Sequence, residues 1–97
     1  MIKHIVFFKL RDVEGKNVKM QEIKQELEKL PSIIKELDEI HVGINVNPAE
    51  EWDLCLEAIV ENMENLEIYS KHPAHQNIVK TLIAPIKEGR ACVDYRI

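Results

Sequence analysis

Hydrophobic positions along the chain alternate in some stretches and recur at helical spacing in others. Residues 2–10 are rich in β-branched and aromatic side chains, which is typical of a β-strand. Residues 18–30 carry hydrophobic side chains at helical spacing, and Pro31 is expected to end or kink this helix. Residues 33–37 predict one or two further helical turns.

The middle of the chain predicts two strands and a short helix. Residues 39–46 and 52–61 alternate between hydrophobic and polar side chains, and a polar turn containing Pro48 joins them. Asn62 is a suitable N-cap for a helix that ends near Lys71.

A last helix is expected from Pro73 to about Glu88, because proline fits the first turn of a helix. Pro85 is expected to disturb the final turn of this helix, and Gly89 to end it. The final strand is predicted over residues 90–97. The resulting order is the split βαβ plan of an α+β, ferredoxin-like domain, with helices on one face of a four-stranded antiparallel sheet.

Size and composition describe one ordinary globular domain over residues 1–97. Net charge is −4, which argues against nucleic acid and anionic membranes as partners, because both attract clustered Lys and Arg. Residues 2–10 are too short, and too often interrupted by charge, for a signal peptide or a membrane span. Cys55 and Cys92 have no CxxC spacing, so free thiols in a reducing cytoplasm are expected.

The first strand predicts a homodimer, because both of its faces carry large hydrophobic side chains. Helices on one face of the sheet would leave Ile5, Phe7 and Ile59 in water. Burying such side chains is worth about 1.5–3 kcal/mol each. A second copy packed face to face would supply that burial, with twofold symmetry. The alternative is a monomer with a small hydrophobic patch.

Four segments resemble one known family: Lys3-His4-Ile5-Val6, Val42-Gly43-Ile44-Asn45, Tyr69-Ser70-Lys71-His72-Pro73-Ala74-His75 and Val93-Asp94-Tyr95. In combination they are similar to the stress-responsive A/B barrel domain (Dabb) family. The resemblance covers nearly the whole chain. It implies a ferredoxin-like protomer and a dimeric α/β barrel built from two sheets. Known members include plant stress-responsive proteins without an agreed reaction, and olivetolic acid cyclase, a cofactor-free enzyme of polyketide aldol condensation.

His4, Tyr69 and His75 are the candidate catalytic residues. His75 lies on the hydrophobic stripe of the last helix, and His4 shares a strand face with Val6 and Phe8. Both imidazoles are therefore expected to point into one pocket between sheet and helices, which could take a small apolar, aromatic or carbonyl ligand. Histidine can take and give a proton near neutral pH, and a phenol can donate to a developing oxyanion.

The resemblance leaves the activity undefined. It implies that Tyr69 and His75 match the acid and base of the cyclase, and that a histidine matching His4 lies in its pocket. This chain departs from the cyclase over residues 52–56, which lack a further pocket histidine, and it has no tyrosine in the first helix. A cofactor-independent cyclase or lyase is therefore one alternative among several.

A purely structural, stress-associated oligomer is a second alternative. In that case His72 caps the last helix, and His75 bonds a neighbouring backbone group or Tyr69. A haem- or quinone-handling enzyme is a weaker third possibility. No cofactor is expected, and no metal is expected at His72 and His75, because Pro73 separates them and no acidic residue completes a ligand set.

Overall fold

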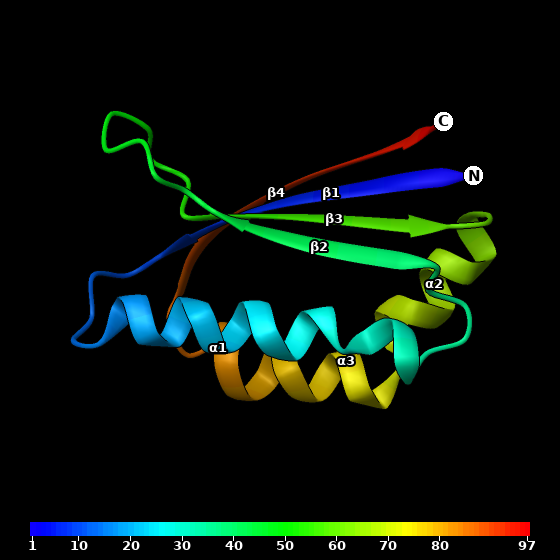
Figure 1. Cartoon of the computed structure of the whole chain (residues 1–97), viewed down its shortest axis with the longest axis horizontal. Helices are drawn as coiled ribbons and strands as arrows, with labels where there is room; N and C mark the ends of the chain where they lie inside the picture. The colour runs from blue at the N-terminus through cyan, green and yellow to red at the C-terminus, as the bar shows by residue number, and fades with distance from the viewer.

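A four-stranded antiparallel sheet forms one layer of the protein, and helices cover one of its faces (Figure 1). The computed structural model describes all of residues 1–97. The strands are β1 (Ile2–Leu10), β2 (Glu39–Ile44), β3 (Leu54–Val60) and β4 (Lys87–Arg96), in the order β2–β3–β1–β4. The helices are α1 (Lys16–Glu28), α2 (Met63–Lys71) and α3 (Pro73–Ile78). This topology confirms the predicted ferredoxin-like α+β fold.

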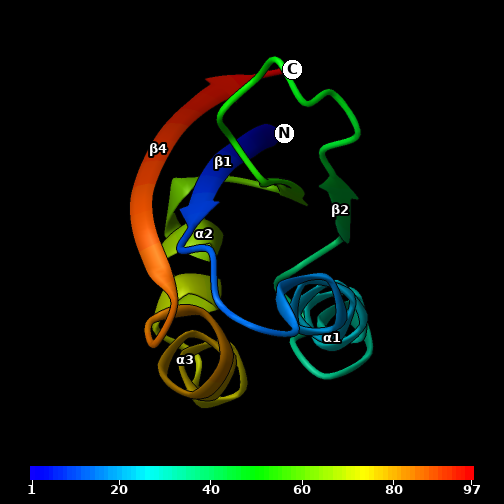
Figure 2. The ribbon, with the colours of Figure 1, turned by 90° about the vertical axis from the view of Figure 1, so that its left-hand side faces the viewer.

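Hydrophobic side chains from the sheet and the helices meet in one core between the two layers. All 21 buried residues are hydrophobic and form a single cluster. Strand β3 shows the reason, because every second side chain from Leu54 to Val60 is buried. Helix α1 contributes Met20, Ile23 and Leu27 at helical spacing, and it runs beside α3 beneath the sheet (Figure 2).

The ends of two helices follow from local chemistry. Gly15 begins α1 with φ of 72°, a left-handed conformation that glycine adopts without a steric penalty. The helix ends at Glu28, and Leu30–Ser32 form a 3₁₀ turn around Pro31, as the proline predicted. Asn62 caps α2, because its side-chain oxygen accepts a hydrogen bond from the Asn65 amide at 2.8 Å.

The end of the last helix differs from the prediction. Helix α3 continues as a π-helical segment, Val79–Ile83, and β4 begins at Lys87 rather than at residue 90. The Ala84 amide closes the π turn on the Val79 carbonyl at 2.7 Å, and the chain then turns at Pro85. Gly89 therefore does not end a helix. It pairs with Lys9 inside the sheet.

Strand β2 is also shorter than predicted. Asn45 ends it with a local turn, in which the Asn47 amide donates to the Asn45 side-chain oxygen at 2.8 Å. The loop that follows, residues 45–53, rises beyond the sheet on the side away from the helices (Figure 1). Val46, predicted as a strand residue, lies exposed in this loop.

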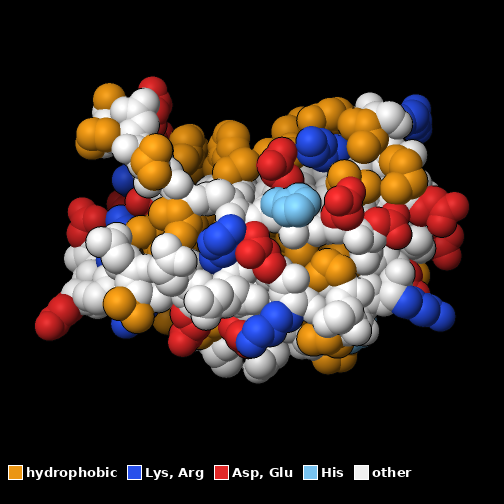
Figure 3. All heavy atoms as spheres, viewed as in Figure 1, with side chains coloured by type: hydrophobic (Ala, Val, Ile, Leu, Met, Phe, Trp, Pro, Cys, Tyr) orange, Lys and Arg blue, Asp and Glu red, His pale blue; other side chains and the backbone are white.

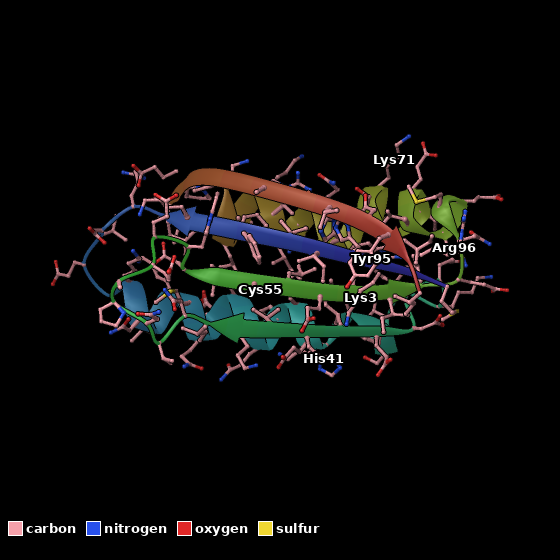
Figure 4. All side chains as sticks on the ribbon, turned by 90° about the horizontal axis from the view of Figure 1, so that it is seen from above. Lys3, His41, Cys55, Lys71, Tyr95 and Arg96 are labelled. Atoms are coloured by element: carbon pink, nitrogen blue, oxygen red, sulfur yellow. The ribbon has the colours of Figure 1, made fainter.

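The other face of the sheet carries hydrophobic side chains with no helix over them. On this open face Phe7, Val93 and Tyr95 are 37%, 55% and 45% exposed. Hydrophobic side chains gather along the corresponding upper surface in Figure 3. Figure 4 looks down on the open face and shows Cys55 on β3 and Tyr95 on β4. None of the helices is long and hydrophobic enough to cross a membrane.

Candidate functional site

His4 lies on the helix-facing side of β1, where it meets the neighbouring strand β4. The strand register sets His4 opposite Asp94. The His4 Nδ1 nitrogen is in direct hydrogen-bond contact with Oδ1 of Asp94, and the His4 side chain is only 12% exposed. A carboxylate is an acceptor, so Nδ1 of His4 carries the proton of this bond. Asp94 thus holds the His4 ring in one orientation.

Tyr69 projects from α2 into the core and is 1% exposed. Its hydroxyl is the one buried side-chain polar atom without a partner in the protein. Burial raises the pKa of the Tyr69 phenol well above its usual value, because the phenolate would be poorly solvated there. Tyr69 is therefore a neutral hydrogen-bond donor at physiological pH.

His75 sits in the first turn of α3, close to the C-terminal end of α2. Its Nδ1 lies 2.9 Å from the Ser70 carbonyl oxygen, which also accepts from the Gln76 side-chain amide at 2.7 Å. A carbonyl can only accept, so Nδ1 is the protonated nitrogen and Nε2 carries the lone pair of the neutral ring. Burial lowers the pKa of His75, which favours this neutral form.

The structure brings the three predicted residues together, with the Tyr69 ring between two imidazoles. Ring centroids of Tyr69 and His75 are 4.5 Å apart, and those of His4 and Tyr69 are 6.3 Å apart with an edge-on arrangement. All three line a cavity of about 150 Å³ between sheet and helices. Val6 and Phe8 form part of its hydrophobic wall.

A wider, open cleft of about 570 Å³ lies beside this cavity. His4, Ser70 and Arg90 line both of them. The lining of the cleft is about equally polar and hydrophobic, and it also includes Met63, Glu64, Leu66, Glu67, Cys92 and Asp94. The two spaces together offer a buried donor at Tyr69 and charged groups nearer the solvent.

His72 does not line the cavity. Its Nδ1 accepts a hydrogen bond from the Ala74 amide at 3.0 Å, so the side chain caps α3. This is the structural role that the sequence suggested for His72. The hydrogen bond from His75 to a backbone carbonyl also agrees with the structural alternative, although His75 additionally lines the cavity.

Sequence reasoning missed Arg90, Cys92 and Asp94 as site residues. The signal was present in the alternation of the last strand, where Val93 and Tyr95 occupy one face and these three polar or ionisable residues the other. Burial raises the pKa of the Cys92 thiol, and Asp94 adds to this effect, so the thiol is protonated at neutral pH.

The fold and this site define a ferredoxin-like α+β domain with a largely hydrophobic cavity between its sheet and its helices, into which a few polar side chains converge. The profile of the stress responsive A/B barrel domain (Dabb) matches residues 2–97, and the chain belongs to that family. No curated protein sequence is significantly similar to the chain.

Several solved structures share the fold. A dimeric, ferredoxin-like protein of unknown function from Bacteroides fragilis is 43% identical, with a TM-score of 0.93 over 99% of this chain and 95% of that one. Another dimeric protein of unknown function, from Thermobifida fusca, is 26% identical, with a TM-score of 0.85 over 99% and 90% of the two chains. The hydroxynitrile lyase of Passiflora edulis is 20% identical, with a TM-score of 0.80 over 99% and 92%. At 20% identity, the similarity to the hydroxynitrile lyase shows only that the two proteins share a fold.

Proposed function

We propose that the protein is a homodimeric small-molecule-binding domain whose ligand presents a carbonyl oxygen to Tyr69. The observation that carries this proposal is the buried Tyr69 hydroxyl, which has no acceptor in the protein and borders a cavity. Leaving such a group without a partner costs about 1–3 kcal/mol. A ligand oxygen that accepts from Tyr69 would recover that energy and would fix the orientation of the ligand.

The same geometry supports acid–base chemistry on the bound carbonyl compound. The neutral His75 ring has its lone pair on Nε2, since Nδ1 donates to Ser70. It could take a proton from the carbon beside the carbonyl, while the electron pair of that C–H bond moves onto the carbonyl oxygen. Tyr69 would then donate its hydrogen bond to the resulting enolate. This is the proton transfer of a cofactor-independent cyclase or lyase.

The hydroxynitrile lyase named above is too distant to transfer its reaction, and its likeness supports only the shared fold. Binding without turnover remains the simpler form of the proposed function, because it requires only the cavity and the Tyr69 donor.

The homodimer is proposed to form through the open face of the sheet. The 43% identical relative is dimeric. In this chain Ile5, Phe7 and Val93 line a hydrophobic hollow of about 160 Å³ on that face. Packing two such faces together would bury side chains that contribute about 1.5–3 kcal/mol each. The pocket lies on the opposite side of the sheet and stays accessible.

A thermal-shift screen of small ketones, aldehydes and aromatic carbonyl compounds tests the proposal. We expect at least one compound to raise the Tm of the wild type but not that of Tyr69→Phe or His75→Gln. Tyr95→Phe is the matched control, because it removes a phenolic hydroxyl that lies outside the cavity. A compound that stabilises wild type and Tyr69→Phe equally contradicts the assigned role of Tyr69. If His75→Gln only lowers the Tm and no compound acts on the wild type, the structural alternative is correct.

A further inference from the structure

Three side chains that bind divalent metal ions gather where β1 and β4 pair, facing the open cleft. His4 and Asp94 are directly opposite each other in the sheet, and Cys92 is two residues from Asp94 on the same face. Their nitrogen, sulfur and oxygen atoms all lie within 4.8 Å of one another. One strand comes from the start of the chain and the other from its end, so the sequence gives no ligand spacing that would reveal the cluster.

The distances in this cluster approach those of a tetrahedral metal site. Cys92 Sγ lies 3.6 Å from His4 Nδ1 and 3.7 Å from Asp94 Oδ1. Zinc binds nitrogen and oxygen at about 2.0–2.2 Å and sulfur at about 2.3 Å, so tetrahedral angles put sulfur about 3.5–3.7 Å from each of the other two ligands. Two of the three distances between the ligand atoms therefore already match those of a tetrahedral zinc site.

The third distance, between His4 Nδ1 and Asp94 Oδ1, is shorter than a metal site requires, because these two atoms share a direct hydrogen bond. A metal ion would take the place of the proton at His4 Nδ1, and the two side chains would move apart to receive it. Metal ligands must be deprotonated, so binding would release that proton and the proton of the Cys92 thiol. The cluster therefore becomes a three-ligand site when these two protons leave and the metal ion takes their place.

The charge of the cleft also favours a cation. Its lining contains the carboxylates of Glu64, Glu67 and Asp94, and one permanent cation, Arg90. Lys71, outside the lining, pairs with Glu67 at 2.6 Å and neutralises that carboxylate. None of these three carboxylates lies within salt-bridge distance of Arg90. With the Glu67–Lys71 pair neutral, Glu64 and Asp94 outnumber Arg90 by one charge, and this excess attracts a divalent cation. The nearby Arg90 opposes binding, so we expect an affinity below that of a closed structural zinc site.

We propose that His4, Cys92 and Asp94 form a binding site for a Zn²⁺-like divalent transition-metal ion. Nitrogen, thiolate and carboxylate ligands together suit such an ion better than Mg²⁺ or Ca²⁺, which prefer oxygen ligands alone. Three protein ligands leave a fourth position for water or an exogenous ligand, as in zinc sites that perform catalysis. This site goes beyond the proposed function and does not rest on it, because Tyr69 and His75 are not among the ligands.

Cobalt(II) is the probe that tests the site, because a thiolate ligand gives its complexes a near-ultraviolet charge-transfer band. The full-length protein, treated with chelator and reductant and then dialysed, is titrated with Co²⁺ alone. We expect one ion per chain, a thiolate charge-transfer band, and loss of the band when Zn²⁺ is added. Absence of the band from the folded wild type overturns the proposal.

Variants assign the ligands. Cys92→Ser should lose the band, whereas Cys55→Ser, which alters the thiol on the other face of the sheet, should keep it. Asp94→Asn should weaken Zn²⁺ binding at least about 10-fold. Even the loss of a group that only hydrogen-bonds to a metal ligand weakens metal binding by about 10–100-fold. Far-UV circular dichroism establishes that each variant is folded. A band that survives in Cys92→Ser overturns the assignment.

The same titration separates this inference from the proposed function. Tyr69→Phe should bind Co²⁺ like the wild type, because Tyr69 supplies no ligand atom. A positive cobalt titration with a negative carbonyl screen supports the metal site and contradicts the pocket. The reverse result supports the pocket and contradicts the metal site.

Discussion

The Nδ1 nitrogen of His75 donates a hydrogen bond to the carbonyl oxygen of Ser70, 2.9 Å away. This contact ties the first turn of α3 to the end of α2, and it selects the tautomer of a half-buried imidazole. Burial lowers the pKa of His75, so the folded protein resists protonation at a pH where the unfolded chain accepts it.

This difference predicts that His75 makes stability depend on pH. The pKa of His75 in the folded protein is depressed, so its contribution is complete above the unfolded value of about 6.5. This contribution to stability is lost as the pH falls towards the lower pKa that His75 has in the folded protein. Urea unfolding at pH 7.5, 6.5 and 5.5 should therefore show a larger loss of free energy of unfolding for the wild type than for His75→Gln. The exposed His41 supplies the control, since His41→Gln should follow the wild type. Parallel curves for wild type and His75→Gln contradict the prediction.

Removing the Tyr69 hydroxyl should not destabilise the protein. The hydroxyl is buried and has no partner in the protein, so Tyr69→Phe removes an unsatisfied group and keeps the ring. We expect the free energy of unfolding to stay equal or rise, by up to about 1–3 kcal/mol. Chemical denaturation of the ligand-free protein measures this. A fall of about 1 kcal/mol or more would mean that the hydroxyl makes a stabilising hydrogen bond in the folded protein.

A charge on the open face should separate the two protomers. Phe7 lies at the centre of that face and is 37% exposed in the single chain. Phe7→Lys would bury an unpaired ammonium group in the proposed interface, which is strongly unfavourable. Light scattering coupled to size-exclusion chromatography should report a monomer for this variant. Val18→Lys is the control, because Val18 lies exposed on α1, and it should stay dimeric like the wild type. A Phe7→Lys protein with the mass of the wild type would rule out this interface.

The capping role of His72 predicts a stability effect without an effect on binding. His72 Nδ1 accepts from the Ala74 amide, so His72→Ala should lower the free energy of unfolding by about 1 kcal/mol. His72→Asn should restore most of it, because asparagine is a good N-cap. Thermal melts compare the three proteins. Any compound that stabilises the wild type should shift the Tm of His72→Ala by the same amount. A reduced shift would mean that His72 contacts the ligand.

Local patterns in the chain were sufficient to predict most elements of the fold. Alternation placed the strands, helical periodicity placed α1, and Asn62 and Pro73 marked two helix starts correctly. These signals depend on neighbours a few residues away. The prediction failed near Gly89, which looked like a helix terminator. There the pairing of β4 with β1 extends the strand back to Lys87, a long-range effect that no local pattern contains.

The sequence by itself determined the α+β class and the two-faced first strand, because both follow from residue types and their spacing. It also determined the family, through the resemblance of four segments and the match over residues 2–97. It also named His4, Tyr69 and His75 as candidates. Only the tertiary structure decided that His4 meets Asp94 and Cys92, since residues about ninety positions apart become neighbours through the register of β1 and β4. It likewise decided that the Tyr69 hydroxyl lacks a protein partner, because hydrogen-bond satisfaction depends on every group packed around the atom.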